Sequence, residues 1–124
     1  MKSLLLIAHG SRRAESNNEI GALTNKLRAL AGNDFGQVQC AFLELADPSI
    51  EAAIDSLVDA GETDIVCLPY FLAKGAHVAS DIPTAMAAAK NKHPDVTFTI
   101  SGYLGASDEV PGILMHLATE ASNA

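Results

Sequence analysis

The amino-acid sequence predicts an α/β fold, a small doubly wound sheet of four parallel strands in the order 2-1-3-4. Four short apolar runs rich in β-branched residues alternate with four longer segments of helical period, the pattern of a βαβα fold. The 124 residues fit one domain, and no linker, low-complexity tract or internal repeat divides them. We therefore expect a single flavodoxin-like domain over residues 1–124, with helices on both faces of the sheet.

The four apolar runs are the expected strands, namely Leu4–Ala8, Val38–Leu43, Ile65–Pro69 and Val96–Ile100. The first run follows Lys2 and superficially resembles a signal peptide, but it is too short for the hydrophobic region of one and ends in a polar turn. No other stretch approaches the roughly 18 apolar residues that a membrane helix requires. We expect a cytoplasmic protein with no membrane partner.

The clearest helix follows the second strand. Asp47 is its expected N-cap, Pro48 stands at the first helical position, and Gly61 ends it. Its apolar residues have helical spacing and are Ile50, Ala53, Ile54, Leu57 and Val58. This spacing predicts a face that packs on the sheet.

The other three helices have apolar residues three and four positions apart. The first ends near Gly32, and its apolar positions are Ile20, Leu23, Leu27 and Leu30. The third begins near Asp81 and Pro83, and its inward positions are Ile82, Ala85, Met86 and Ala89. The last begins near Asp108, and its inward positions are Val110, Ile113, Leu114 and Leu117. We expect the inward positions of the third and last helices to pack in the core.

The formal net charge is −7 at pH 7, and the eight Lys and Arg residues are spread along the chain. This distribution argues against a nucleic-acid partner, because phosphate binding needs clustered cations. A strongly anionic substrate would need a locally basic rim on this acidic protein.

The two cysteines, Cys40 and Cys67, lie in separate predicted strands. With the first strand between them, their backbones are too far apart for a disulfide. We expect two free thiols.

Two histidines and a glutamate follow three different strands. His9 comes directly after the first strand, Glu44 after the second, and His77 in the segment after the third. In the order 2-1-3-4 the carboxyl ends of the strands meet at one edge, and a crevice opens between the first and third strands. Each histidine alone can be an ordinary turn residue, and Glu44 can simply be solvated. Two histidines at the crevice, each near a glycine, favour a functional site.

Two imidazoles and a carboxylate suit a borderline divalent ion such as Co²⁺, Fe²⁺, Ni²⁺ or Zn²⁺. A tight structural zinc site would normally have four ligands, often thiolates, so this set predicts a site with open positions that can release its metal. The other two histidines, His93 and His116, lie away from the crevice, and we expect both on the surface.

Ser11, Arg12 and Arg13 lie between the first strand and the first helix. They can bind an anion at the helix N-terminus, or the basic pair can simply be solvated. Neither GxxxxGK[ST] nor GxGxxG follows the first strand, which argues against a phosphate loop.

Four segments in order, HGSR, FLELADPSI, LPYFLAKGAHVASDIP and GYLG, resemble the short-form sirohydrochlorin cobaltochelatase family within the class II chelatases. The resemblance covers nearly the whole chain. It implies a chelatase-like half unit: longer enzymes contain two such halves, and a short chain forms a homodimer that builds the tetrapyrrole cavity.

The resemblance also implies an activity. The chain would be a lyase-type enzyme that inserts Co²⁺, or Fe²⁺ or Ni²⁺, into sirohydrochlorin or a close tetrapyrrole in cobalamin or siroheme biosynthesis. The metal is then a substrate, and no organic cofactor is expected. His9 and His77 would bind the metal and assist removal of the pyrrole N–H protons, with Glu44 as the accompanying carboxylate.

The many carboxylates of such a tetrapyrrole would need cationic partners. Arg12, Arg13 and Lys74 are the expected ones, together with Ser11 and exposed backbone N–H groups at the strand ends. Two other hypotheses remain open. A non-catalytic metal or tetrapyrrole carrier would use the same residues, and an interaction domain would have no ligand site.

Overall fold

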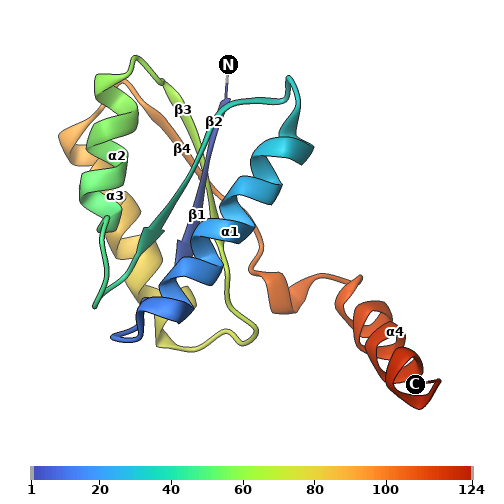
Figure 1. The fold of residues 1–124 in the computed structure, drawn as a ribbon. Helices are drawn as coiled ribbons and strands as arrows, with labels where there is room; N and C mark the ends of the chain where they lie inside the picture. The colour runs from blue at the N-terminus through green and yellow to red at the C-terminus, as the bar shows by residue number, and fades with distance from the viewer. Residues whose placement is uncertain (1, 124) are drawn as a thin grey trace.

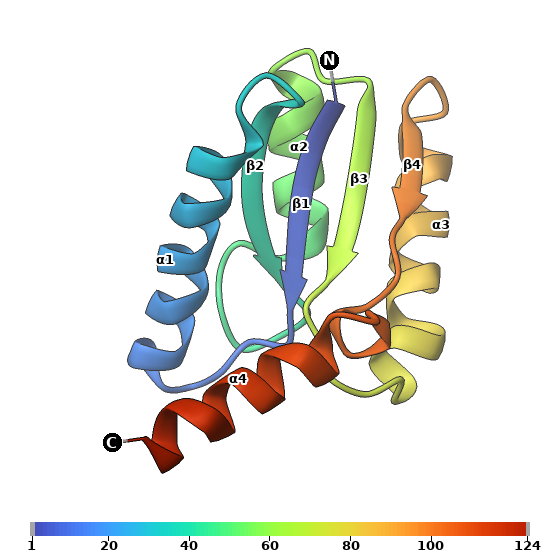
Figure 2. The same cartoon turned by 90° about the vertical axis from the view of Figure 1, so that its right-hand side faces the viewer.

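The computed structural model describes residues 2–123. Its strands are β1 (Lys2–Ala8), β2 (Phe35–Phe42), β3 (Asp64–Pro69) and β4 (Thr97–Ile100). They are all parallel, and their order is β2-β1-β3-β4 (Figure 2). The predicted sheet and its strand order are confirmed.

The helical elements of the described chain are α1 (Ala14–Ala31), α2 (Ile50–Asp59), the π-helical turn η1 (His77–Asp81), α3 (Ile82–Lys92), the 3₁₀ turn η2 (Leu104–Ala106) and α4 (Val110–Ser122). Figure 1 views the sheet nearly edge-on, with α1 on one face and α2 and α3 on the other. Among residues 2–123, no helix is both long and apolar enough to cross a membrane.

The start of α2 differs from the sequence prediction. Ser49 is its N-cap, and the Ser49 side-chain oxygen accepts a hydrogen bond from the Ala52 N–H at 3.1 Å, a contact worth about 1 kcal/mol. Asp47 and Pro48 belong to the preceding connection, and the Pro48 carbonyl accepts a bond from the Phe42 N–H at 2.9 Å. The predicted N-cap was wrong because Asp47 and Ser49 are both good capping residues on either side of one proline.

The main core lies between the sheet and the α2–α3 layer. Its fully buried members come from several elements and are Leu5, Ile7, Ile54, Leu57, Ile65 and Ile82. Burying each such side chain stabilises the fold by about 1.5–3 kcal/mol. The apolar faces predicted for α2 and α3 are therefore confirmed, and this core holds the strands whose carboxyl ends carry the candidate site.

The opposite face of the sheet is only partly covered. One row of in-register residues on this face runs from Val38 through Leu4 and Val66 to Thr99. Val38 and Leu4 are buried, Val66 is half-buried, and Thr99 is exposed. The shielding by α1 thus ends at β1, and no helix within residues 2–123 covers the β3–β4 half of this face.

The last helix does not pack as predicted. Its apolar residues Ile113, Leu114 and Leu117 are 52%, 59% and 55% exposed, and α4 projects away from the sheet (Figure 1). The inward positions predicted for this helix were wrong because helical spacing identifies an apolar face but not the surface that covers it. Leu30, one of the apolar residues that indicated α1, is 82% exposed.

Both cysteines are free thiols, as predicted. Cys40 lies opposite Leu6 of β1, whereas Cys67 lies opposite Leu5, so the two side chains are on opposite faces of the sheet. The Cys67 thiol is buried against the Met86 sulfur at 3.1 Å, and burial raises the pKa of Cys67 to about 12. Cys67 is therefore a core residue with little thiolate character.

Candidate functional site

His9 and Glu44 are brought together by the connections that leave β1 and β2. The Glu44 N–H donates to the His9 carbonyl at 3.1 Å, and the Leu43 N–H donates to the Ala8 carbonyl at 3.0 Å. Gly10 lies so close that a Cβ at its position would stand 1.8 Å from the Glu44 carbonyl oxygen, and its φ is +96°. This approach requires glycine.

The His9 ring lies between two oxygen atoms. Its Nε2 is 3.0 Å from Glu44 Oε1, and its Nδ1 is 2.9 Å from the Gly10 carbonyl oxygen. Because a carbonyl only accepts, Nδ1 carries the proton in that contact. The other ring nitrogen, Nε2, faces the Glu44 carboxylate, which in its ionised form also only accepts, so a hydrogen bond there needs a second proton, carried by Nε2 or by the carboxyl group.

His77 reaches the same place from η1, after β3. Its ring centroid is 4.6 Å from that of His9, with an angle of 60° between the ring planes. Its Nδ1 is 2.7 Å from Asp81 Oδ2, and its ring stacks on Phe71 with a centroid separation of 6.0 Å. The His9 and His77 side chains are 41% and 40% exposed, so a small molecule can reach both.

The connection that carries His77 is held in place by η2. The Gly105 N–H donates to the Phe71 carbonyl at 2.9 Å, and a Cβ on Gly105 would stand 1.7 Å from the Leu72 carbonyl oxygen. The Tyr70 N–H also bonds the Ile7 carbonyl at 2.8 Å. The GYLG segment after β4 thus fixes the backbone of Phe71, whose ring stacks on His77.

Two open grooves flank the histidine pair. One lies on the side of α2 and α3, has a volume of about 450 Å³, and includes Glu44, Glu51, His77 and Asp81 in its lining. The other lies on the side of α1, has a volume of about 280 Å³, and includes His9 and Tyr70. His77 therefore lines the groove on one face of the sheet, and His9 lines the groove on the other.

The three predicted site residues meet pairwise, His9 with Glu44 and His9 with His77. In the part of the chain that the structure describes, no group of three or more His, Cys, Asp and Glu side chains is arranged around a common metal position. The hydrogen bond between His9 Nε2 and Glu44 would have to open for Nε2 to bind a metal.

The chain is similar to known proteins over nearly its whole length. The CbiX family model matches residues 3–121. The chain belongs to the CbiX family. It is 34% identical over 117 residues to a sirohydrochlorin cobaltochelatase of Priestia megaterium, covering 92% of this chain and 36% of the relative. It is 30% identical over 126 residues to a chloroplastic sirohydrochlorin ferrochelatase of Arabidopsis thaliana, covering 95% and 55%.

Two solved structures share the fold of this chain. The sirohydrochlorin chelatase SirB from Bacillus subtilis subspecies spizizenii, in complex with cobalt, has a TM-score of 0.84 at 28% identity, covering 96% of this chain and 50% of that one. A CbiX protein from Marinobacter aquaeolei VT8 has a TM-score of 0.86 at 23% identity, covering 99% of this chain and 98% of that one. At this identity the likeness supports the fold and nothing further. The chain spans 36% of the length of the Priestia megaterium cobaltochelatase and 55% of that of the Arabidopsis thaliana ferrochelatase. It spans half of the SirB chain.

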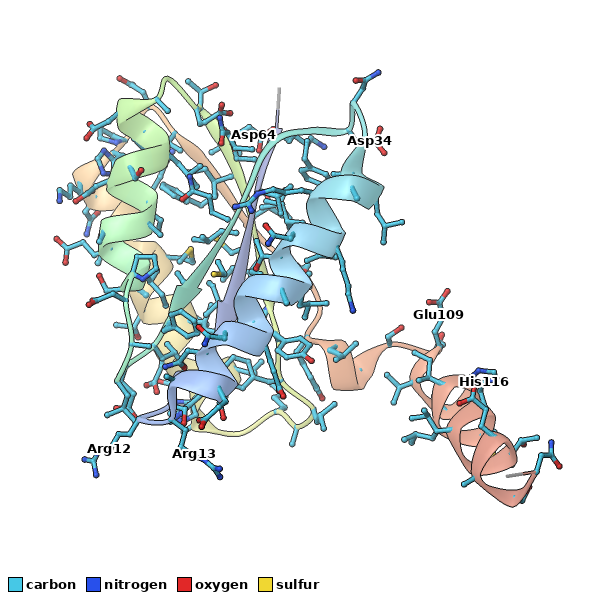
Figure 3. The ribbon with its side chains drawn as sticks, in the orientation of Figure 1. Arg12, Arg13, Asp34, Asp64, Glu109 and His116 are labelled. Atoms are coloured by element: carbon cyan, nitrogen blue, oxygen red, sulfur yellow. The ribbon has the colours of Figure 1, made fainter. Side chains whose placement is uncertain are left out.

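Within residues 2–123, the four remaining predicted site residues of this CbiX chain make no side-chain hydrogen bond or ion pair with the histidine pair. The Ser11 hydroxyl accepts from the Arg13 N–H at 3.0 Å, and the Ser11 N–H donates to Asn17 Oδ1 at 3.0 Å, so Ser11 shapes its own turn. Arg12 and Arg13 extend outward at the site edge (Figure 3), and Lys74 is exposed. Within residues 2–123, neither guanidinium has an ion-pair partner.

His116 and His93 lie apart from the site. His116 is on the surface of α4, as predicted, and pairs with Glu120 at 2.8 Å (Figure 3). His93 is more buried than predicted, because it joins Lys92 in binding Asp55 of α2, at 2.8 and 2.7 Å. The Lys92 hydrogen bond, and then that of His93, lower the pKa of Asp55. This cluster fastens α3 to α2.

Sequence reasoning missed Asp81 as a site residue and treated it only as the start of a helix. The available signal was its spacing of four residues from His77, which brings side chains together on one side of a helical turn.

Proposed function

We propose that this CbiX chain inserts a divalent metal ion into sirohydrochlorin or a close tetrapyrrole. The observation that carries the proposal is the pair of imidazoles from the segments that follow the neighbouring strands β1 and β3, 4.6 Å apart between centroids, with Glu44 3.0 Å from one of them. Relatives named as sirohydrochlorin cobaltochelatases and ferrochelatases support the choice of substrate.

The residues fit the chemistry of insertion. The entering metal must lose its water ligands while the ring loses its inner N–H protons. Two imidazoles hold a divalent ion while leaving coordination positions open for ring nitrogens. Glu44 can accept a proton directly or through His9, because its carboxylate is within hydrogen-bond reach of Nε2. In this proposal His9, His77 and Glu44 are the metal ligands and the bases.

Co²⁺ is the metal we propose, with Fe²⁺ and Ni²⁺ as further substrates. Related structures are described as complexes with cobalt and with Fe³⁺, so sites of this kind accept more than one ion. An absorbance assay of sirohydrochlorin with Co²⁺, Fe²⁺ and Ni²⁺ in parallel tests the proposal. We expect Co²⁺ to be inserted fastest, and absence of insertion with all three ions would refute it.

Arg12, Arg13 and Lys74 form the proposed basic rim for the carboxylates of the tetrapyrrole. We expect the R12A/R13A double variant to raise the KM for the tetrapyrrole by about tenfold, with little change in kcat, and to weaken the dependence of KM on salt. Steady-state kinetics at several salt concentrations measure both effects. Lys26→Ala, on α1 and outside both grooves, is the control, and an unchanged KM in the double variant would contradict the assignment.

We further propose that the active unit is a homodimer. An apolar face of α4 and the β3–β4 half of the sheet both lack cover in one subunit, and each can bury the other across a two-fold axis. The chain matches half of the SirB chain, so a second copy would take the place of the remaining half.

Light scattering tests the dimer. We expect twice the 12.9 kDa chain mass at micromolar concentration, and a monomer for the L114D/L117D variant, since each charge would be buried at the interface. Leu30→Asp, at an exposed leucine of α1, is the matched control and should stay dimeric. A strict monomer for the unmodified chain would contradict the proposal.

A further inference from the structure

Asp81 is a carboxylate in direct contact with the candidate site but is not one of the proposed metal ligands. We propose that Asp81 is a positioning residue, which holds the His77 ring in the tautomer with the proton on Nδ1 and leaves Nε2 free to bind the metal. The role of His77 as a metal ligand rests on the proposed function. The tautomer of its ring can be measured whether or not that function holds.

Hydrogen-bond accounting supports this assignment. A neutral imidazole has one N–H donor and one acceptor nitrogen, and a carboxylate only accepts. The contact of 2.7 Å between His77 Nδ1 and Asp81 Oδ2 therefore requires the proton on Nδ1. The lone pair then lies on Nε2. Metal-binding histidines commonly donate their second N–H to such a partner, which fixes the ring and increases its basicity.

The backbone supports the position of Asp81. His77 and Asp81 are the first and last residues of η1, whose wide turn is closed by a hydrogen bond from the Ile82 N–H to the His77 carbonyl. The next residue, Ile82, is fully buried in the core, which anchors this end of the turn. Phe71 stacks on the same ring, at 29° to the imidazole plane. Asp81 and Phe71 thus restrict the ring in two different ways.

The two histidines of the site are oriented by different acceptors. His9 Nδ1 faces the backbone carbonyl of Gly10, whereas His77 Nδ1 faces a side chain. The His77 contact leaves its Nε2 available to a ligand, whereas the Nε2 of His9 faces Glu44 Oε1 at 3.0 Å and must leave it before it binds a ligand. Only the second acceptor can be removed by substitution, so Asp81 is where the arrangement can be tested.

The contact contributes little to folding. The side chains of His77 and Asp81 are 40% and 51% exposed, and exposed ion pairs add little to stability. The chain contains a comparison pair with the same spacing, His116 and Glu120, in contact at 2.8 Å through Nε2 and remote from the site. Removal of either carboxylate should leave the fold intact, but only the loss of Asp81 should affect the site.

The first measurement is the tautomer of His77 in the metal-free protein, by long-range proton–nitrogen NMR with ¹⁵N-labelled histidine at alkaline pH. His77→Ala identifies the signals. We expect the Nδ1–H form in the unmodified chain, a mixture or the Nε2–H form in Asp81→Ala, and recovery of Nδ1–H in Asp81→Glu. An unchanged Nδ1–H form in Asp81→Ala would overturn the proposal.

The second measurement is Co²⁺ affinity by calorimetry, with circular dichroism to check the fold. We expect Asp81→Ala to weaken Co²⁺ binding by about 10–100-fold, Asp81→Glu to restore part of it, and Glu120→Ala to leave it unchanged. In the insertion assay the KM for metal should rise and that for the tetrapyrrole should not. Equal losses in Asp81→Ala and Glu120→Ala would overturn the positioning role. Absence of Co²⁺ binding by the unmodified chain would instead refute the proposed function, and the tautomer measurement would still decide the role of Asp81.

Discussion

Replacing His77 with Ala is expected to reduce the rate of metal insertion by about 10²–10⁴-fold, because the substitution removes both a ligand and a base. The fold should persist. His77 lies outside the buried core, and its ring contacts are with the exposed Asp81, with Phe71 and with the half-exposed His9. The insertion assay measures the rate, and thermal unfolding followed by circular dichroism checks the fold.

Two further variants make the His77 result specific. His9→Ala should cause a comparable loss, since the two rings form one site. His116→Ala, on the exposed α4 surface, should retain full activity. Near-normal insertion by the folded His77→Ala variant would show that the histidine pair is not the reaction site.

Replacing Gly10 with Ala should damage the fold and the site together. Its Cβ would stand 1.8 Å from the Glu44 carbonyl oxygen, a backbone atom that cannot rotate away, and its φ of +96° is unfavourable for any side chain. Such backbone strain costs about 1–3 kcal/mol, and movement of the loop would separate His9 from Glu44. We expect a lower urea midpoint and a large loss of insertion activity.

Gly21→Ala is the matched control for this substitution. Gly21 lies inside α1, and apart from its chain neighbours and the backbone of its own helix no heavy atom would lie within 4 Å of its added Cβ. Because glycine in a helix is about 1 kcal/mol less favourable than alanine, this variant should be at least as stable as the unmodified chain. If Gly10→Ala matched Gly21→Ala in both stability and activity, the close approach of the β1 and β2 connections would not matter.

The sheet and the meeting of His9, His77 and Glu44 could be predicted because they depend on strand order. Short apolar runs separated by helices allow few right-handed arrangements, and the order 2-1-3-4 places the ends of β1 and β3 side by side. Gly10 could be recognised in the sequence as a glycine that permits close backbone approach. The group that it approaches, the Glu44 carbonyl, could not be identified from the sequence.

Other features depend on contacts that sequence spacing does not reveal. The apolar stripe of α4 predicted burial, yet Leu114 and Leu117 are exposed in the single chain, because the covering surface is not set by the helix itself. Asp81 had the same spacing from His77 as Glu120 has from His116, so spacing alone could not separate a site contact from a surface pair. The role of Gly105 depends on the Leu72 carbonyl, more than thirty residues earlier in the chain.

The most direct test of the central claim is a turnover experiment with the unmodified chain. Sirohydrochlorin and Co²⁺ are supplied in large excess over protein, and the absorbance of the metallated product is followed with time. We predict many product molecules per chain, at a rate that falls sharply in the His9→Ala and His77→Ala variants. A signal that stops once each chain has bound one equivalent would instead identify a carrier and contradict the account.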